Sequence, residues 1–478
     1  MQNSGNTIRT RAAPSPTGFM HVGNARTFLF EYLFAKSVGG EFHLRIEDTD
    51  QKRYVEGAEQ VVYDTFNFLG LKWDGEVIKQ SSRLSIYKDY ARKLVEQGNA
   101  YFCFCSEERL SQLREEQEKN HQPTGYDRKC RDLHADEVLE KIKNGESHVI
   151  RLKMPETGKI VLSDMIRGEI EFDLSLVDDQ VLLKADGFPT YHLAVVVDDH
   201  MTGITHVIRG DEWVSSIPKH IYLYQCFGWE PTKYGHLSVI LGSDKKKKLS
   251  KRDGAVSVEA FRTQGYLVEA IINYIALLGW NPGTEREFFT LAELEKEFNI
   301  KRVQKSPAMF DMEKFNHFNA HYIHEMNDVE LLKKIKPFSE IDFSKYANEF
   351  LQKVISVVKT RMVTLKDFDV YSHFFFTWQP PKKDMIKFAK SDWQNTILGF
   401  EKAIEKLENL DDWNTIEKLN EVLLSVVTEN GLKNGDVFWP IRASLSAESA
   451  SPSPTELLWV LGKELSLNRL KKCLVIIK

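Results

Sequence analysis

The order of apolar and polar positions over the first fifty residues predicts a strand, a loop, a helix and a second strand. Residues 7–13 are partly apolar and extended, and the prolines and glycine of 14–18 exclude a helix or a central strand there. Residues 23–38 then carry apolar side chains at helical spacing, ended by Gly39-Gly40, and residues 41–46 alternate as a strand does. This order is typical of a parallel sheet, so the chain opens as an α/β fold.

A segment of different character interrupts the parallel-sheet pattern. Residues 101–193 combine a charged helix at 106–119 with short strands, which lie near Val149, Ile160, Ile170 and Val181. We therefore expect an inserted α+β domain. The sheet pattern then returns, with predicted strands at 193–197 and 206–208 and a helix at 217–227.

From about residue 290 onward the apolar periodicity is helical. Clear helical segments lie at 346–360, 393–407 and 457–474, separated by prolines at 379–381 and 451–454. We find no internal repeat in the chain. The sequence thus predicts an α/β half followed by an all-α C-terminal half.

The composition is that of a large folded protein. At roughly 150 residues per domain, 478 residues suggest about three domains. The chain is 42% hydrophobic and 28% charged, which excludes a disordered protein. Its net charge of −5 argues against a protein that coats nucleic acid over its whole surface, although a local basic face is compatible with it.

Apolar runs and cysteines indicate the compartment. The apolar runs are far shorter than the ~18 residues that a membrane helix needs, and the first ten residues, MQNSGNTIRT, lack the apolar stretch of a signal peptide. Five cysteines, an odd number in a long chain, fit a reducing environment. We expect a cytoplasmic protein that has no membrane partner.

Two distant segments carry residues suited to nucleotide chemistry. His21-Val22-Gly23-Asn24 stands where the first loop enters the predicted helix, and a helix start offers unpaired N–H groups and a positive dipole to a phosphate. Residues 241–254 concentrate lysines between two glycines. Such a run is either a solvated surface loop or a loop that neutralises a phosphate chain during transfer.

These segments resemble the HIGH and KMSKS motifs of class I aminoacyl-tRNA synthetases, present here as HVGN at 21–24 and KLSKR at 248–252. Asn24 replaces the final His and Arg252 the final Ser, and both resemble variants of the glutamyl and glutaminyl branch. Four further motifs in the same order resemble bacterial glutamyl-tRNA synthetases. They are RAAPSPTG at 11–18, LRIEDTD at 44–50, YHLA at 191–194 and IRGDEW at 208–213.

The resemblance implies a two-step reaction with no covalent enzyme intermediate. Glutamate attacks the α-phosphate of ATP to give glutamyl-adenylate and pyrophosphate, and the terminal ribose hydroxyl of tRNA(Glu) then takes the glutamyl group. The protein contributes positioning and charge stabilisation, and Mg²⁺ accompanies the ATP. The catalytic residues that the resemblance implies are His21, Lys248 and Lys251, and those three bind ATP together with Gly23, Asn24 and Glu212.

The resemblance also implies a glutamate site. Arg11 and Arg209 are the partners of the two substrate carboxylates, which suit the planar fork of arginine. Ser15 and Tyr191 are neutral hydrogen-bonding partners, and Glu47 accepts from the α-ammonium. Which arginine meets which carboxylate is left open.

Three of the five cysteines lie in the predicted insertion, at Cys103, Cys105 and Cys130. Three thiolates completed by Asp132 or His134 would give the four ligands of a structural Zn²⁺. Some bacterial glutamyl-tRNA synthetases resemble this arrangement, and Asp132 stands where their histidine does. Reduced thiols without a metal are the alternative.

The resemblance divides the chain into four parts. They are a split Rossmann-like catalytic domain at 1–100 and 190–240, an inserted acceptor-stem-binding domain at 101–189, a KLSKR loop with a helical stem-contact domain at 241–325, and an all-α anticodon-binding region at 326–478. Arg361 and Arg442 are its candidate anticodon contacts, whereas the five tryptophans of the C-terminal region are expected to pack in its core.

Two alternative functions stay open. A glutaminyl-tRNA synthetase resembles the same catalytic half joined to β-barrels, so the helical C-terminal half favours the glutamyl reading. A tRNA-binding paralogue without activity is disfavoured because His21, Glu47, Lys248 and Lys251 are all intact. We expect a monomer.

Overall fold

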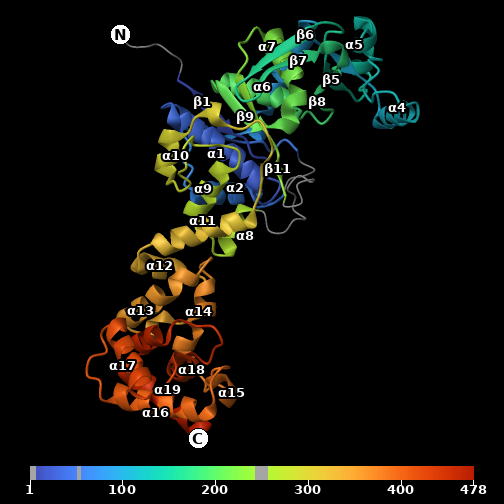
Figure 1. The fold of residues 1–478 in the computed structure, drawn as a ribbon. Helices are drawn as coiled ribbons and strands as arrows, with labels where there is room; N and C mark the ends of the chain where they lie inside the picture. Colours follow the sequence, from blue (N-terminus) through green and yellow to red (C-terminus); the bar gives the residue numbers. More distant parts are fainter. Residues whose placement is uncertain (1–6, 51–54, 243–256) are drawn as a thin grey trace, which may run out of the picture. The chain divides into compact units, whose positions relative to one another are not determined.

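The computed structural model describes residues 7–50, 55–242 and 257–478, and these form two compact units (Figure 1). The first unit comprises Met1–Phe261 and Ile271–Asp311, and the second Arg262–Ala270 and Met312–Lys478. Among the described residues, no helix is both long enough and apolar enough to cross a membrane.

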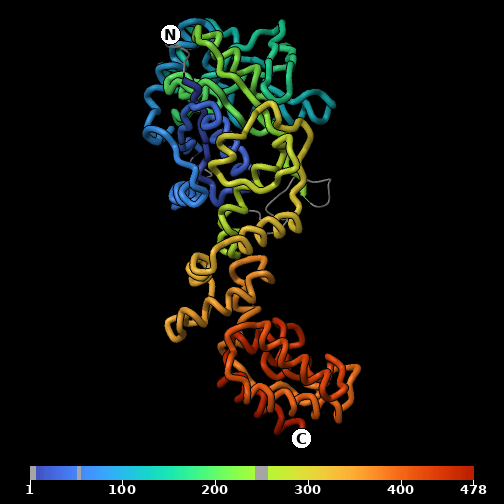
Figure 2. The backbone as a smooth tube through the Cα atoms, turned by 60° about the vertical axis from the view of Figure 1, so that its left-hand side comes forward, coloured from blue at the N-terminus to red at the C-terminus, as the bar shows by residue number. Residues whose placement is uncertain are grey.

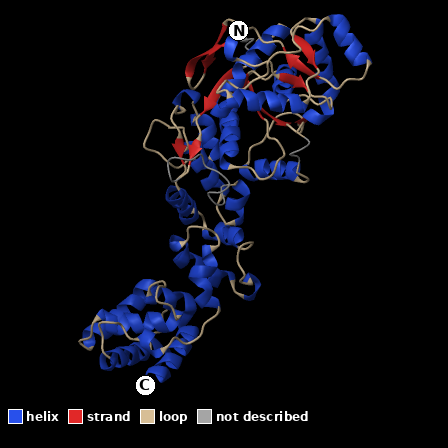
Figure 3. Ribbon diagram, turned by 90° about the vertical axis from the view of Figure 1, so that its right-hand side faces the viewer, coloured by secondary structure: helices blue, strands red, loops and turns tan. Residues whose placement is uncertain are grey.

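Parallel strand pairs form the centre of the first unit (Figure 3). The strands, in three groups, are β1 (Arg9–Ala12), β2 (Glu41–Ile46) and β3 (Ile78–Lys79); β9 (His206–Gly210) and β10 (Lys233–Leu237); and β11 (Ile240–Leu241) and β12 (Ala308–Met309). The backbone N–H of Thr205 donates to the carbonyl of Arg9 at 3.0 Å, which places β9 beside β1. The carboxyl ends of β1, β2 and β9, where ligands bind in such sheets, therefore lie close together.

Helices connect and cover these strands. They are α1 (Val22–Ser37), α2 (Ala58–Leu69), α3 (Leu84–Glu96), α6 (Tyr191–Met201), α7 (Ile217–Phe227) and α10 (Leu291–Glu297). Helix α1 joins β1 to β2 and is buried around most of its circumference, from Val22 through Ala35. Short 3₁₀ helices lie at Gln80–Arg83 and at Asp211–Ser216, the second directly after β9.

The strand expected at 193–197 is wrong, because these residues form the middle of α6. All five side chains from Leu193 to Val197 are buried. A helix buried on every side shows no amphipathic period, and a run of β-branched valines within it imitates a strand.

The inserted α+β segment is present as expected. It contains the antiparallel strands β4 (Ala100–Cys103), β5 (Val149–Leu152) and β8 (Val181–Leu183), the hairpin of β6 (Lys159–Asp164) and β7 (Gly168–Asp173), and the helices α4 (Glu107–Lys119) and α5 (Ala135–Lys143). Ile150 and Leu182 pack in one apolar core with Leu193 and Val207, so the insertion is built onto the parallel-strand region.

The described residues of the second unit form helices joined by loops, without a strand (Figure 2). Its helices are α11 (Met312–Glu325), α12 (Asp328–Ile335), α13 (Asn348–Val358), α14 (Asp367–Phe376), α15 (Lys383–Ile386), α16 (Trp393–Glu408), α17 (Ile416–Glu429), α18 (Asn434–Ser446) and α19 (Pro454–Ile477). The preceding helices α8 (Val258–Thr263) and α9 (Val268–Leu277) each contribute residues to both units. Trp378, Trp393, Trp413 and Trp459 pack against the core of this unit.

Candidate active site

A buried ion network joins β1, β2 and α6. Arg11 donates from Nε to Asp199 at 3.1 Å and from Nη1 to Glu31 at 3.2 Å. Arg45 donates to the same oxygen of Asp199 at 2.5 Å and to Glu47 at 3.0 Å. Two of the residues expected to bind glutamate, Arg11 and Glu47, are therefore connected through Asp199 and Arg45.

Burial and neighbouring charges act in opposite directions on the carboxyl groups of this network. Burial raises the pKa of Glu47, although the charge of Arg45 opposes this shift. Burial also raises the pKa of Glu31, to about 8, against the opposing charge of Arg11. Burial also opposes ionisation of Asp199, but Arg11 and Arg45 lower its pKa below the usual range. Asp199 is thus the fixed negative charge that compensates two buried guanidinium groups.

Arg209, at the end of β9, is held by four partners. It donates from Nη1 to the Tyr191 hydroxyl at 2.9 Å, from Nη2 to the carbonyl of Trp213 at 3.1 Å and from Nε to His236 at 3.1 Å, and Nη1 lies 3.4 Å from His220. Burial raises the pKa of Tyr191, and the charges of Arg209, Glu47 and Arg11 also act on it. The four side chains Arg11, Glu47, Tyr191 and Arg209 therefore gather in one place.

The start of α1 carries the HVGN motif. His21 is the N-cap residue, and its Nδ1 accepts from the Gly23 N–H at 3.1 Å. The first turn of α1 contains no acidic residue, so nothing there offsets the positive end of the helix dipole. Asn24 is exposed in this turn, where an anion would approach.

The residues that follow the lysine-rich segment, from Ser257 onward, lie against the HVGN motif. Lys248 and Lys251 fall outside the described residues, but Ser257 forms a bridge with His21, and the Val258 N–H donates to the carbonyl of Met20 at 3.1 Å. Residues more than two hundred positions apart in the sequence thus meet at the start of α1.

Ser15 and Glu212, the other residues expected at the site, lie on the segments that follow β1 and β9. The Glu47 N–H donates to the carbonyl of Pro14 at 3.0 Å, which fixes the loop that carries the exposed Ser15. The exposed Glu212 follows β9, and its carboxylate folds back so closely on Gly210 that a side chain at that position would collide with it.

Comparison with known proteins identifies the family. The family model described as tRNA synthetases class I (E and Q), catalytic domain, matches residues 7–317, and a model of an anticodon binding domain matches residues 330–474. The chain belongs to the class I tRNA synthetases of the E and Q group. The resemblance inferred from the motifs is confirmed.

Relatives of this synthetase align over nearly its whole length. A glutamate–tRNA ligase of Clostridium novyi (strain NT) is 46% identical over 480 residues, covering 97% of each chain, and one of Clostridium botulinum (strain Okra / Type B1) is 44% identical, covering 98% of each. The crystal structure of a glutamate tRNA ligase from Elizabethkingia meningosepticum CCUG26117 in complex with its amino acid matches with a TM-score of 0.91 at 34% identity, covering 99% of this chain and 100% of that one.

The synthetase carries a cysteine cluster in its inserted segment. The sulfur atoms of Cys103, Cys105 and Cys130 all lie within 4.8 Å of one another. The hydroxyl of Tyr126 lies 3.3 Å from the sulfur of Cys103 and 3.5 Å from that of Cys105. Hydrogen bonding to Cys130 and Tyr126 lowers the pKa of Cys103 despite its burial, and the same bond to Cys103 raises the pKa of Cys130, so the pair favours one thiolate.

The expected fourth ligands do not belong to this cluster. Asp132 is exposed and lies 3.4 Å from Lys153, and the exposed His134 caps the start of α5. The Tyr126 hydroxyl is the oxygen that lies beside the sulfurs. The metal and the identity of its fourth ligand stay predictions.

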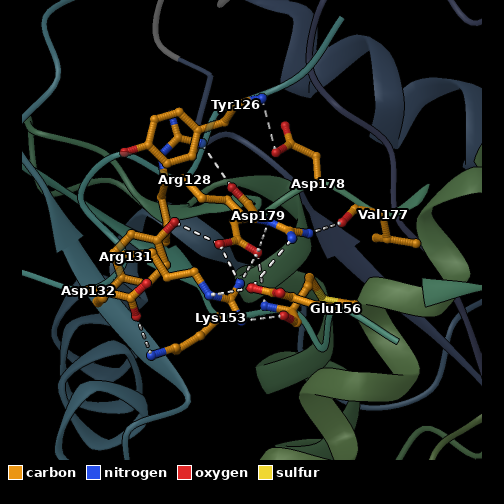
Figure 4. A network of polar contacts seen from close by, with 12 residues as sticks. Tyr126, Arg128, Arg131, Asp132, Lys153, Glu156, Val177, Asp178 and Asp179 are labelled. Carbon is orange, nitrogen blue, oxygen red and sulfur yellow. Dashed lines mark hydrogen bonds and ion pairs between the residues drawn. The ribbon is translucent and has the colours of Figure 1, made fainter. Parts of the chain in front are cut away.

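The segment that contains Cys130 is tied to the rest of the insertion by the buried Asp179 (Figure 4). Arg131 donates to both carboxylate oxygens of Asp179, at 2.9 and 2.8 Å, and the Tyr101 hydroxyl donates to one of them at 2.8 Å. Arg128 lies 3.7 Å from the same group. This network holds Cys130 against β4, the strand that carries Cys103.

Neither candidate anticodon residue of the synthetase forms an ion pair with a described residue. Arg361 donates to the carbonyl of Val357 at 2.6 Å, and Arg442 donates to that of Ser449 at 3.0 Å. The Arg442 guanidinium also lies over the ring of Trp439, 4.5 Å from its centre. Both side chains are partly exposed.

The residues that support the site belong to none of the assigned roles in the sequence. Asp199 and Glu31 hold Arg11, and Arg45 holds Glu47, yet none of the three was assigned a role. One feature of the sequence indicates a buried ion pair here: Asp198-Asp199 directly follow the apolar run at 193–197. A carboxylate next to a buried run needs a cation to compensate its charge.

Proposed function

We propose that this synthetase activates L-glutamate with ATP and transfers it to the 3′ end of tRNA(Glu). The observation that carries the proposal is the gathering of Arg11, Arg209, Glu47 and Tyr191 near the carboxyl ends of β1, β2 and β9. Two guanidinium groups match two carboxylates, and Glu47 matches one ammonium. The Nη2 of Arg11 donates to none of the described residues, so it is available to the substrate.

ATP binds at the start of α1 in this proposal. The free N–H groups of the helix and the side chains of His21 and Asn24 hold phosphate oxygens, and Gly23 lets the nucleotide approach the backbone. Lys248 and Lys251 stabilise the charge on the α-phosphate during transfer, and Glu212 contacts the adenosine. Mg²⁺ accompanies the nucleotide.

The tRNA contacts extend along the chain. We assign the acceptor stem to the insertion at 101–189, further stem contacts to 241–325, and the anticodon to 326–478 through Arg361 and Arg442. The match of residues 330–474 to an anticodon binding domain supports the last assignment. That the protein acts as a cytoplasmic monomer stays a prediction.

The cysteine cluster holds a structural Zn²⁺ in this account. Three cysteine sulfurs that all lie within 4.8 Å of one another are a donor set that zinc prefers, and the Tyr126 hydroxyl lies beside them. The metal would fix the segment 126–130 to β4, far along the chain from the residues that bind glutamate.

Amino-acid-dependent exchange of pyrophosphate into ATP tests the proposal. Glutamate and glutamine are compared, each with and without total tRNA. Exchange with glutamate supports it, and dependence on tRNA reveals the order of binding. Exchange with glutamine alone would identify a glutaminyl enzyme, and silence with both amino acids in the presence of cognate tRNA would favour a binding paralogue.

A further inference from the structure

A fully buried pair, Asp164 and His236, lies directly behind Arg209. Oδ2 of Asp164 is 2.6 Å from Nδ1 of His236, and Nε2 of the same ring accepts from Nε of Arg209 at 3.1 Å. Both members of the pair have fully buried side chains. A row of three residues thus leads from the insertion to the guanidinium that is proposed to bind glutamate.

The surroundings of Asp164 fix the orientation of every group in this row. Its Oδ1 accepts from the backbone N–H groups of Ile166, Arg167 and His236, at 2.9, 2.8 and 3.3 Å. Burial opposes ionisation, but the hydrogen bonds from His236 and these N–H groups lower the pKa of Asp164. The carboxylate is therefore ionised and accepts on both oxygens, so the proton of His236 lies on Nδ1.

This tautomer matters for Arg209. With the proton on Nδ1, the Nε2 of His236 presents a lone pair to the Nε–H of Arg209. With the proton on Nε2, two N–H donors would face each other at the same place. The guanidinium of Arg209 also lies over the ring of Tyr234, with its carbon 5.0 Å from the ring centre, and this contact further restricts its orientation.

The pair originates in the inserted hairpin. Asp164 ends β6 and begins the turn to β7, while His236 lies on β10, paired in register with Arg209 on β9. The same turn also contacts the segment after β9, where Arg167 donates to Asp211 at 2.8 Å.

We propose that Asp164 and His236 are positioning residues that set the orientation of Arg209 for its carboxylate. The inference rests on the proposed function, because it assumes that Arg209 binds glutamate. It assigns to the insertion a part in amino acid recognition in addition to any contact with tRNA.

Asp164→Asn is the most specific test of this positioning role, because asparagine has the same shape as aspartate. The three backbone donors keep the amide oxygen at the Oδ1 position, so the NH₂ group faces His236 and forces its proton onto Nε2. The KM for glutamate is expected to rise about tenfold or more, as loss of a hydrogen bond to a charged group does, while the KM for ATP stays close to that of the wild type. Glu171→Gln removes an exposed carboxylate from the same hairpin and is the matched control.

Two variants of His236 separate positioning from packing. His236→Phe keeps the ring volume but neither polar atom, whereas His236→Gln keeps one donor and one acceptor. If His236 positions Arg209, the glutamate KM is lower for His236→Gln than for His236→Phe. Adding Asp164→Asn to His236→Phe then has no further effect on the glutamate KM. Thermal unfolding of each variant is measured alongside.

Three results would overturn the inference: an unchanged glutamate KM in Asp164→Asn, additive effects in the double variant, or equal rises in the KM values for glutamate and ATP. If Asp164→Asn does not fold, equal glutamate KM values for the two His236 variants overturn it. A wild-type protein without glutamate-dependent exchange refutes the proposed function, and this inference with it.

Discussion

Arg11 and Asp199 form a buried ion pair, with Nε and Oδ1 3.1 Å apart, between residues 188 positions apart in the sequence. The same carboxylate also accepts from Arg45. One anion therefore compensates two guanidinium groups, one of which is proposed to meet the substrate and one of which holds Glu47.

Asp199→Asn is expected to destabilise the first unit by roughly 3–5 kcal/mol, because it leaves two buried cations without their shared anion. Urea unfolding followed by tryptophan fluorescence measures the loss. Glu171→Gln, in an exposed pair with Lys159, is expected to change the free energy of unfolding by less than about 0.5 kcal/mol. Equal stabilities of the Asp199 variant and the wild type would contradict this role of Asp199.

Lys251→Ala is expected to lower the rate of glutamyl-adenylate formation by on the order of a hundredfold, as the loss of one transition-state donor does, with tRNA affinity nearly unchanged. Single-turnover formation of the adenylate and a filter-binding assay measure the two quantities. Lys245→Ala, in the same lysine run but outside the KLSKR motif, serves as the control and should lose far less. An unchanged rate removes Lys251 from the mechanism.

Cys130→Ser is expected to abolish zinc binding, with the wild type holding about one zinc per chain. Elemental analysis of the purified proteins measures it. Cys226→Ser, in α7 and outside the cluster, retains the metal. Tyr126→Phe weakens retention against a chelator if the hydroxyl is the fourth donor, whereas Asp132→Asn does not. A wild type without zinc refutes the metal assignment.

His206 makes stability depend on pH. Burial, aided by Lys233, lowers the pKa of this histidine to about 4 in the folded state, against about 6.5 when unfolded. Between these values the unfolded state binds more protons, so stability falls as the pH falls.

His206→Gln is therefore expected to reduce the loss of unfolding free energy between pH 7 and pH 5 by about 2 kcal/mol. Urea titrations at the two pH values measure it. His121→Asn, at an exposed position, should leave the loss as in the wild type. A His206 variant with an unaltered pH dependence would show that the histidine titrates normally.

Elements with a clear period were predictable from the sequence. The strand at 41–46 and the helix at 217–227 have the predicted bounds, because alternation and helical spacing mark one buried face in each. Residues 193–197 were misassigned since burial on all sides erases the period.

The motif residues were predictable because short segments carry them. Their supports were not, since a pair such as Arg11 and Asp199 is made only by the fold. The surroundings of the cysteine cluster are a further case. The order of residues along the chain gives no sign that the Tyr126 hydroxyl, which accepts from the Cys130 N–H, also lies beside the sulfur of Cys103.

The amino acid that the protein attaches to tRNA is the most direct measure of its specificity. The protein is incubated with ATP, Mg²⁺, total tRNA and all twenty amino acids in equal amounts, and the esterified amino acid is released and identified by mass spectrometry. The account predicts glutamate, in an amount that depends on ATP and falls to background in Lys251→Ala. Glutamine on the tRNA, or no amino acid above background, would contradict it.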